Sequence, residues 1–151
     1  MDIEVIVTDS DNNDFIKLTA LLDEDLDIRY GLLQKQYKQH NKIDLIKNVV
    51  IIYKNNEPAA CGAFKEFDNS SVEIKRVFVR KELRQQGLSK LIMSKLEEIA
   101  KGKGYRYAVL ETGQKQYAAI SLYQKLNYTP IPNYGPYIGN TNSICMKKTL
   151  Y

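Results

Sequence analysis

The chain contains 151 residues, of which 44% are hydrophobic and 26% are charged, a balance typical of one globular domain with a buried core. Its formal net charge of +4 suits an anionic ligand, but the scattered lysines form no basic run of the kind that binds nucleic acid. The N-terminus lacks the segments of a signal peptide, and no apolar run reaches the length of a membrane span. We therefore expect a single cytoplasmic domain over residues 1–151, without nucleic-acid or membrane partners.

Cysteine and histidine usage limits the chemistry further. Cys61 and Cys145 lie in apolar, strand-like stretches and are expected to be buried, reduced thiols. His40 is the single histidine, and the sequence has no Cys/His cluster. The sequence therefore predicts no metal site. It also argues against a cysteine-based covalent intermediate, because neither thiol has a histidine partner.

The first part of the chain predicts strands and helices from its apolar periodicity. The expected elements are a strand at residues 3–7, a helix through residues 15–22, a second helix at residues 26–39 that contains Gly31, and strands at residues 49–53 and 59–67. Asp9, Ser10 and Asp11 are the expected N-caps of the first helix.

Residues 72–100 form the stretch on which the functional argument depends. An alternating pattern from Val72 leads into the apolar run Val77-Phe78-Val79, which predicts a strand. Apolar residues at spacings of three and four from Leu88 to Ile99 predict an amphipathic helix. A basic turn with one glycine joins the two elements.

The remainder completes one mixed sheet. The pattern predicts a helix end at residues 102–104, a strand at residues 107–110, a helix at residues 116–126 ending at Asn127, and strands at residues 128–131 and 143–150 around a loop at residues 132–137. The expected order is β-α-α-β-β-β-α-β-α-β-β. This order indicates an α/β fold with a single mixed sheet and helices on both faces.

The turn before the central helix has the chemistry of an anion cradle. The first backbone amides of a helix lack intrahelical acceptors, and the helix dipole makes this end positive. Gly87 has no Cβ, so an anion can approach the backbone closely. No Gly-Lys-Ser/Thr follows the glycine and no G-x-G-x-x-G is present, which excludes a P-loop and a dinucleotide fingerprint.

Two motifs resemble those of the GNAT N-acetyltransferase superfamily, in particular its small single-domain bacterial members. Residues 84–89 read Arg-Gln-Gln-Gly-Leu-Ser and resemble the superfamily's Arg/Gln-x-x-Gly-x-Gly/Ala pyrophosphate loop, with Ser89 in place of Gly or Ala. Residues 119–128 resemble its Ala-Ile-x-Leu-Tyr-x-Lys-x-Gly-Phe helix, with Asn127 and Tyr128 in place of Gly-Phe. The resemblance implies the GNAT acyl-CoA N-acyltransferase fold and acetyl-CoA as co-substrate.

The resemblance also implies how the donor would be held. Backbone groups of Val77, Phe78 and Val79 would pair with the pantetheine arm, and one of their amides would stabilise the oxyanion. Gln116 stands where the superfamily often has Asn and would contact the same arm. The loop residues that the motif assigns to the pyrophosphate are Arg84, Gln85, Gln86, Gly87, Leu88, Ser89 and Lys90.

Three residues are candidates for proton transfer. By the resemblance, Tyr123 is the general acid for the leaving thiolate, although the chain has 11 tyrosines and a helical tyrosine is often part of the core. Glu73 and Glu111 occupy positions at which different branches of the superfamily place the general base. Each glutamate is alternatively a partner of a neighbouring cation, and many superfamily members have no dedicated base.

The acceptor is expected to be a small primary amine, such as an amino acid or a related metabolite. Arg29, Tyr30 and Arg76 are candidates to meet a substrate carboxylate, and Tyr134 and Tyr137 are candidates to line the acceptor pocket or simply to pack their loop.

Other readings remain open at this point. A protein N-terminus or lysine is the alternative acceptor, and a CoA-binding sensor without turnover is the alternative of another class. An enzyme that acetylates charged tRNA is a minor option, because it would need a basic patch. A homodimer is compatible with the resemblance.

Overall fold

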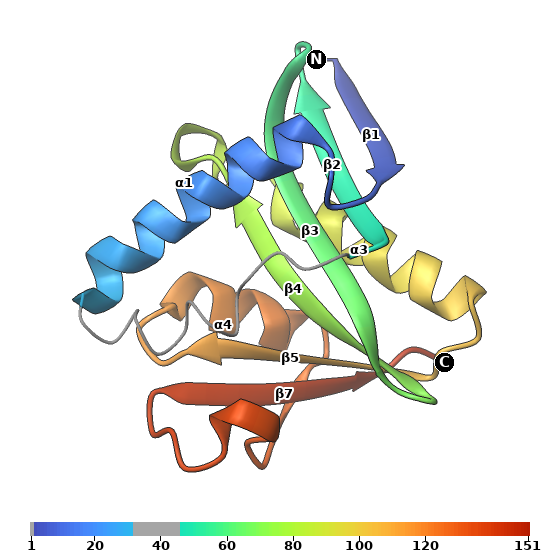
Figure 1. Ribbon diagram of the computed structural model, residues 1–151, viewed down its shortest axis with the longest axis vertical. Helices are drawn as coiled ribbons and strands as arrows, with labels where there is room; N and C mark the ends of the chain where they lie inside the picture. The colour runs from blue at the N-terminus through green and yellow to red at the C-terminus, as the bar shows by residue number, and fades with distance from the viewer. Residues whose placement is uncertain (1, 32–45) are drawn as a thin grey trace. The chain divides into compact units, whose positions relative to one another are not determined.

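The computed structural model describes residues 2–31 and 46–151. Its elements are β1 (Ile3–Thr8), α1 (Asn13–Tyr30), β2 (Asn48–Lys54), β3 (Glu57–Asp68), β4 (Ser71–Val79), η2 (Lys81–Leu83), α3 (Leu88–Gly102), β5 (Tyr107–Gly113), α4 (Tyr117–Lys125), β6 (Thr129–Ile131), η3 (Gly135–Tyr137) and β7 (Ser143–Thr149) (Figure 1). The strands form one mixed sheet in the order β1-β2-β3-β4-β5-β7-β6. This sheet confirms the predicted α/β fold class.

The chain divides into two compact units. The first comprises the residues up to Lys65 together with Lys75–Leu96, and the second comprises Glu66–Ile74 together with Glu97–Tyr151. The boundary therefore falls inside β4, between Ile74 and Lys75. That residues 1–151 act as a single domain stays a prediction.

In the first unit, helices cover both faces of the strands. Gly62 of β3 faces α3, where a Cβ would meet the side chains of Ile92 and Leu96. Its neighbours Cys61 and Ala63 point to the opposite face, because side chains alternate along a strand. There they join the core beneath α1, which crosses the strands in Figure 1. The core on this face consists of Phe15, Leu18, Leu22, Leu26, Tyr30, Ile46, Val49, Ile51, Cys61, Ala63 and Phe78.

One prediction about the N-terminal helices was wrong. Instead of a break between residues 22 and 26, α1 runs without interruption from Asn13 to Tyr30. Leu22, Leu26 and Tyr30 continue one buried stripe at a spacing of four, so packing extends the helix through the acidic residues between them. Gly31, with a φ of 55°, ends α1. Residues 32–39 of the predicted second helix lie outside the described residues, as does His40.

The start of α1 also differs from expectation. Its N-cap is Asn12, not one of the three preceding polar residues. The Asn12 side-chain oxygen accepts hydrogen bonds from the backbone amides of Asp14 (2.8 Å) and Phe15 (3.1 Å). Asp9 instead accepts a hydrogen bond from the backbone of Asp11, which makes it part of the turn before the helix.

In the second unit, β5 lies between β4 and β7. β4 runs parallel to β5 and β7 runs antiparallel to it. α3 ends in a left-handed turn at Gly104 (φ 94°), and the turn after α4 contains Asn127 in the predicted left-handed conformation (φ 75°). β5 extends to Gly113, which places Glu111 inside the strand.

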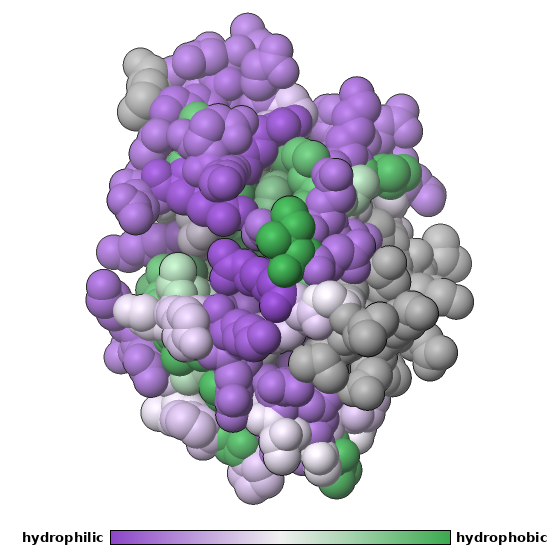
Figure 2. All heavy atoms as spheres, turned by 90° about the vertical axis from the view of Figure 1, so that its left-hand side faces the viewer, coloured by the Kyte–Doolittle hydropathy of each residue, from purple (hydrophilic) through white to green (hydrophobic). Residues whose placement is uncertain are grey.

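Both cysteines are buried and free, as predicted. On the face shown in Figure 2, the described residues are mostly hydrophilic, and hydrophobic residues occur in small separate patches. Among the described residues, no helix combines the length and the apolar character needed to cross a membrane.

Candidate active site

The loop between β4 and α3 has an unusual backbone. After η2, Gln85 and Gly87 adopt left-handed conformations, with φ values of 64° and 83°. Glycine reaches this region without steric cost, whereas Gln85 adopts it with some strain. A Cβ built at Gly87 would meet no protein atom within 4 Å, so the space beside this residue is open.

A run of backbone amides in this loop lacks acceptors. The amides of Arg84 and Leu91, at the two ends of the segment, donate to Lys81 and Gly87. Between them, the six amides of residues 85–90 donate to no acceptor in the part of the chain that the structure describes. These amides lie at the N-terminus of the 15-residue helix α3, where the dipole favours an anion.

The predicted loop residue Arg84 is held by contacts within the first unit. Its Nε donates to the Val79 carbonyl at 3.0 Å, and its guanidinium forms an ion pair with Asp25 of α1 at 3.1 Å. The same group lies over the Phe78 ring, 5.6 Å from its centre. In this arrangement the guanidinium ties the loop to the end of β4.

The backbone of β4 is paired with β5 over a short length. The register joins Ser71 to Tyr107, Val72 to Ala108 and Glu73 to Val109, and it includes no later residue of β4. The predicted donor-binding run, Val77 to Val79, therefore has no ladder to β5. The Val79 carbonyl is nevertheless occupied, because it accepts the hydrogen bond from Arg84.

The three residues proposed to meet a substrate carboxylate all lie in the first unit. Arg76 is buried, and its guanidinium contacts Thr19 and Asp23 of α1. Tyr30 is buried in the core beneath α1, and Arg29 is half-buried in the last turn of that helix.

The two candidate bases lie on one face of the second unit. Glu111 of β5 is paired with Cys145 of β7, and Glu73 of β4 is paired with Val109, two residues before Glu111. Paired residues share a face, as do residues two apart along a strand. The register therefore brings Glu73, Glu111 and Cys145 together. Burial raises the pKa of the Cys145 thiol, and the charges of both glutamates raise it further.

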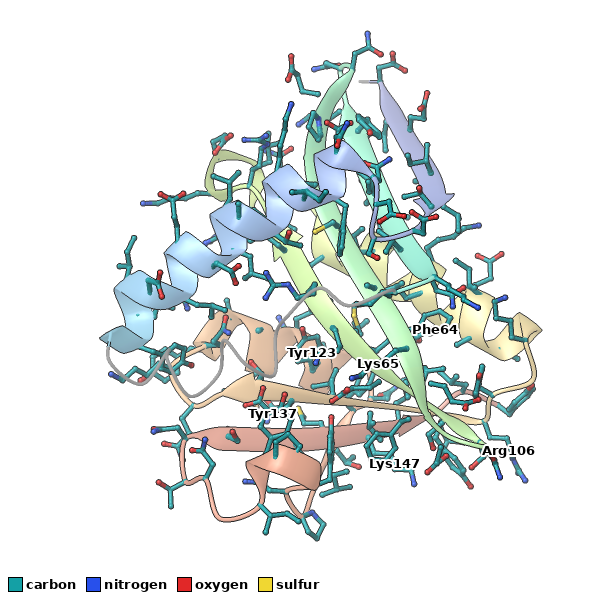
Figure 3. The ribbon with its side chains drawn as sticks, viewed as in Figure 1. Phe64, Lys65, Arg106, Tyr123, Tyr137 and Lys147 are labelled. Atoms are coloured by element: carbon teal, nitrogen blue, oxygen red, sulfur yellow. The ribbon has the colours of Figure 1, made fainter. Side chains whose placement is uncertain are left out.

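The predicted tyrosines of the η3 segment lie at the same face. The Tyr134 hydroxyl donates to Glu73 Oε2 at 2.8 Å, and its ring makes edge contacts with Phe67 (4.8 Å between centres) and Tyr137 (5.7 Å). Burial and the Glu73 carboxylate raise the pKa of Tyr134 well above its usual range. Tyr137 is buried and extends from η3 over β7 (Figure 3).

Tyr123, the candidate acid, is buried on α4 (Figure 3). Burial, and secondarily the charge of Glu111, raises its pKa to about 12. Its ring makes an edge contact with Tyr128, with 5.9 Å between centres. Gln116 precedes α4, half-buried, and its backbone amide donates to the Gly113 carbonyl.

Two residues near these sites were not predicted. Asn133 organises the η3 segment, because its Nδ2 donates to the carbonyls of Tyr137, Asn140 and Ser143 at 3.0–3.2 Å. Asp23 holds Arg76 from a position 53 residues earlier in the chain. No local pattern identifies such a distant partner, whereas Asn133 lies in a Pro-Asn-Tyr-Gly-Pro stretch that is typical of a built turn.

The described residues contain no group of three or more His, Cys, Asp or Glu side chains able to hold a metal ion.

Comparison with known proteins identifies the family. A model described as Acetyltransferase (GNAT) family matches residues 15–128. The chain is 32% identical over 121 residues to the uncharacterised protein YyaT of Bacillus subtilis, covering 75% of this chain and 79% of that protein. It is 28% identical over 102 residues to an IAA acetyltransferase of Azospirillum brasilense, covering 67% of each protein.

Solved structures agree with this assignment. A candidate acyl-CoA N-acyltransferase from Klebsiella pneumoniae matches with a TM-score of 0.82 and 27% identity, over 99% of this chain and 98% of that chain. The PaiA N-acetyltransferase of Thermoplasma acidophilum, solved in complex with coenzyme A, matches with a TM-score of 0.72 over 99% of each chain. At 17% identity, this second likeness concerns the fold alone.

The family model spans most of the chain and includes both the loop at residues 84–90 and the helix that carries Tyr123. The chain belongs to the acetyltransferase (GNAT) family and is an acyltransferase.

Proposed function

We propose that this protein transfers the acetyl group of acetyl-CoA to a primary amine by direct attack. The observation that carries the proposal is the run of six amides, residues 85–90, that donate to no acceptor among the described residues at the start of α3. A pyrophosphate supplies the oxygen atoms and the negative charge that such a run accommodates. GNAT proteins from other organisms have been solved with this class of ligand, including PaiA with coenzyme A.

The donor is held mainly by backbone groups. The amides of residues 85–90 receive the pyrophosphate, and the run Val77–Val79 pairs with the pantetheine arm. Arg84 now donates to the Val79 carbonyl, so this carbonyl becomes available to the arm when the Arg84 side chain moves. Such movement also brings the guanidinium to an anionic ligand, for which its planar fork is suited.

The transfer itself is a balanced exchange. The amine nitrogen attacks the thioester carbonyl carbon, and the carbon–sulfur bond breaks. The products are the N-acetylated amine and free CoA. The amine loses one proton and the leaving thiolate gains one. An amide of the Val77–Val79 run stabilises the oxyanion, and Glu73 or Glu111 accepts the amine proton.

Tyr123 provides the proton or the hydrogen bond for the leaving sulfur. Its pKa of about 12 keeps the phenol protonated at physiological pH. A thiol has a pKa of about 8.5, so complete transfer to the thiolate is uphill in this environment. Hydrogen-bond donation by the hydroxyl to the developing thiolate is therefore its contribution, and a thiolate that leaves unprotonated takes its proton from water.

The acceptor that we favour is a small primary amine, and a protein N-terminus or lysine is the alternative. Tyr134 contacts Glu73, and Phe67 and Tyr137 pack against the Tyr134 ring; these three residues are the ones that we assign to the acceptor. A cytoplasmic location accords with the two free thiols. A homodimer stays a proposal by analogy.

The proposal is tested by incubating the purified protein with acetyl-CoA and separate panels of small amines, amino acids and lysine-containing peptides. CoA release is followed optically and each product is identified by mass spectrometry. Acetylated small amines are the expected result, whereas acetylation of peptides alone would move the acceptor class to proteins. Binding of acetyl-CoA without transfer to any panel would contradict the enzyme proposal and favour a CoA sensor.

A further inference from the structure

The most strained position in β4 lies directly before the donor-binding run. Arg76 has a φ of 59° in the middle of the strand Ser71–Val79. For a residue other than glycine, this left-handed conformation is unfavourable and persists only where the surroundings enforce it. Such interruptions occur near active sites, where they redirect the backbone that follows. At Arg76, the backbone that follows is Val77 to Val79.

The surroundings that enforce this conformation come from α1. The Arg76 side chain is 2% exposed, and its Nη2 donates to the Thr19 carbonyl at 3.0 Å and to Asp23 Oδ1 at 2.9 Å. The Arg76 carbonyl in turn accepts a weak hydrogen bond from the Cys61 thiol at 3.4 Å. The side chain and the backbone of this residue are therefore both held, from α1 and from β3.

Asp23 is the α1 residue that forms an ion pair with Arg76, although a charged residue in a helix is usually expected to face solvent. Its side chain is 43% exposed, at the edge of the buried stripe of α1. An ordinary surface ion pair contributes little, but the partner here is a buried guanidinium. Without Asp23, the guanidinium has only the Thr19 carbonyl among its described partners, and the enforced conformation of Arg76 loses its charged anchor.

We propose that Asp23 is a positioning residue for acetyl transfer, acting through Arg76. The Asp23–Arg76 pair holds the left-handed backbone that aims the amides of Val77–Val79 at the acetyl-CoA carbonyl. The inference rests on the proposed function. It adds that a residue of α1 helps to position the amides that stabilise the oxyanion. A misplacement of about 1 Å at such a contact lowers the rate by up to about 10²-fold.

The experiment compares Asp23→Ala, Asp23→Asn and Asp23→Glu with the wild type. Glu24→Gln is the matched control, because it removes one negative charge from an exposed neighbour on the same helix. Circular dichroism sets a common assay temperature below the melting point of every variant. At that temperature, kcat and the KM values for acetyl-CoA and for the amine are measured. The infrared stretch of bound acetyl-CoA labelled with ¹³C at its carbonyl reports on the oxyanion contact.

We expect Asp23→Ala to lower kcat about tenfold or more, to leave the KM for the amine unchanged and to return the carbonyl stretch toward its value in water. Asp23→Glu should recover part of both signals, and Glu24→Gln should match the wild type. Arg76→Ala keeps the steric cost of the left-handed conformation and removes the anchor, so it should resemble Asp23→Ala.

Two results would overturn the inference. If the Asp23 variants melt at lower temperature but keep wild-type kcat and the wild-type carbonyl stretch, the pair is only structural. If Arg76→Ala retains full kcat, the anchor is not needed for aiming. In both cases the wild type still acetylates its amine and the proposed function stands. A wild type that binds no acetyl-CoA would overturn the proposed function and this inference together.

Discussion

Tyr123 is the residue whose surroundings bear most directly on how the thiolate would leave. It is buried, and its pKa is raised to about 12, so the hydroxyl retains its proton at neutral pH. The sequence predicted that this tyrosine lies on a helix, and α4 confirms that part of the prediction. The sequence did not predict the charge of Glu111 nearby, because Glu111 is twelve residues away on a different element.

Tyr123→Phe tests the role of the hydroxyl. Removing the proton donor should lower kcat by about 10²-fold or more while acetyl-CoA affinity is retained. Tyr117→Phe, on the exposed side of the same helix, is the control and should behave as wild type. Single-turnover rates and calorimetric affinities separate the two effects. Unchanged kcat in Tyr123→Phe would assign the residue to packing.

Other residue-scale features depend on contacts that sequence cannot show. Arg84 and Arg76 were both predicted to contact ligands. In the structure their guanidiniums contact Asp25 and Asp23 of α1, respectively. The four residues form two ion pairs over separations of more than fifty positions, and neither pair leaves a periodic signal in the sequence.

At the scale of elements, the local patterns were reliable where a turn signal marked each boundary. Strand β4, the loop before Leu88 and helix α3 all follow from residues that are adjacent in sequence. The division of α1 into two helices was wrong for the opposite reason. No glycine or proline occurs between Leu22 and Leu26, and the apolar stripe determines the outcome through packing that is not local.

Gly62 shows how closely α3 approaches β3. A Cβ at this position would lie 2.5 Å from Ile92 Cγ2 and 2.9 Å from Leu96 Cδ1. The Ile92 methyl group is attached to a β-branched carbon and has little freedom to move, so the helix itself must shift.

Gly62→Ala should therefore lower the free energy of unfolding by about 1–3 kcal/mol, measured by urea denaturation. Gly102→Ala is the matched control. Gly102 lies in the last turn of α3, and a Cβ there would meet no atom within 4 Å. The control should be neutral or stabilising by up to about 1 kcal/mol. A Gly62→Ala protein as stable as wild type would contradict the close packing described for α3.

For the whole molecule, buried acids that resist ionisation predict a loss of stability at high pH. Burial raises the pKa of Cys61 from 9.0 to about 12, and burial together with Glu111 raises that of Tyr123 to about 12. Between about pH 9 and pH 12, the unfolded chain releases these protons and the folded chain retains them. The unfolded state then binds fewer protons, so the free energy of unfolding falls as the pH rises.

Denaturation at about pH 8 and about pH 10.5 measures this effect. The wild type should be clearly less stable at the higher pH. Cys61→Ala should show a smaller difference between the two pH values, because it removes one of the buried acids. Stability that does not change over this interval would mean that these groups ionise as readily in the folded protein as in the unfolded chain.

The central claim is that the amides at the start of α3 bind the pyrophosphate of acetyl-CoA. Calorimetric titration of acetyl-CoA into the wild type, Gly87→Asp and Gly104→Asp tests it most directly. Both glycines have left-handed φ values, 83° and 94°, and open space beside them, so the two variants add the same charge and similar strain near opposite ends of α3. We predict that the wild type and Gly104→Asp bind and that Gly87→Asp does not, with the fold retained by circular dichroism. Equal binding by all three proteins would contradict the claim.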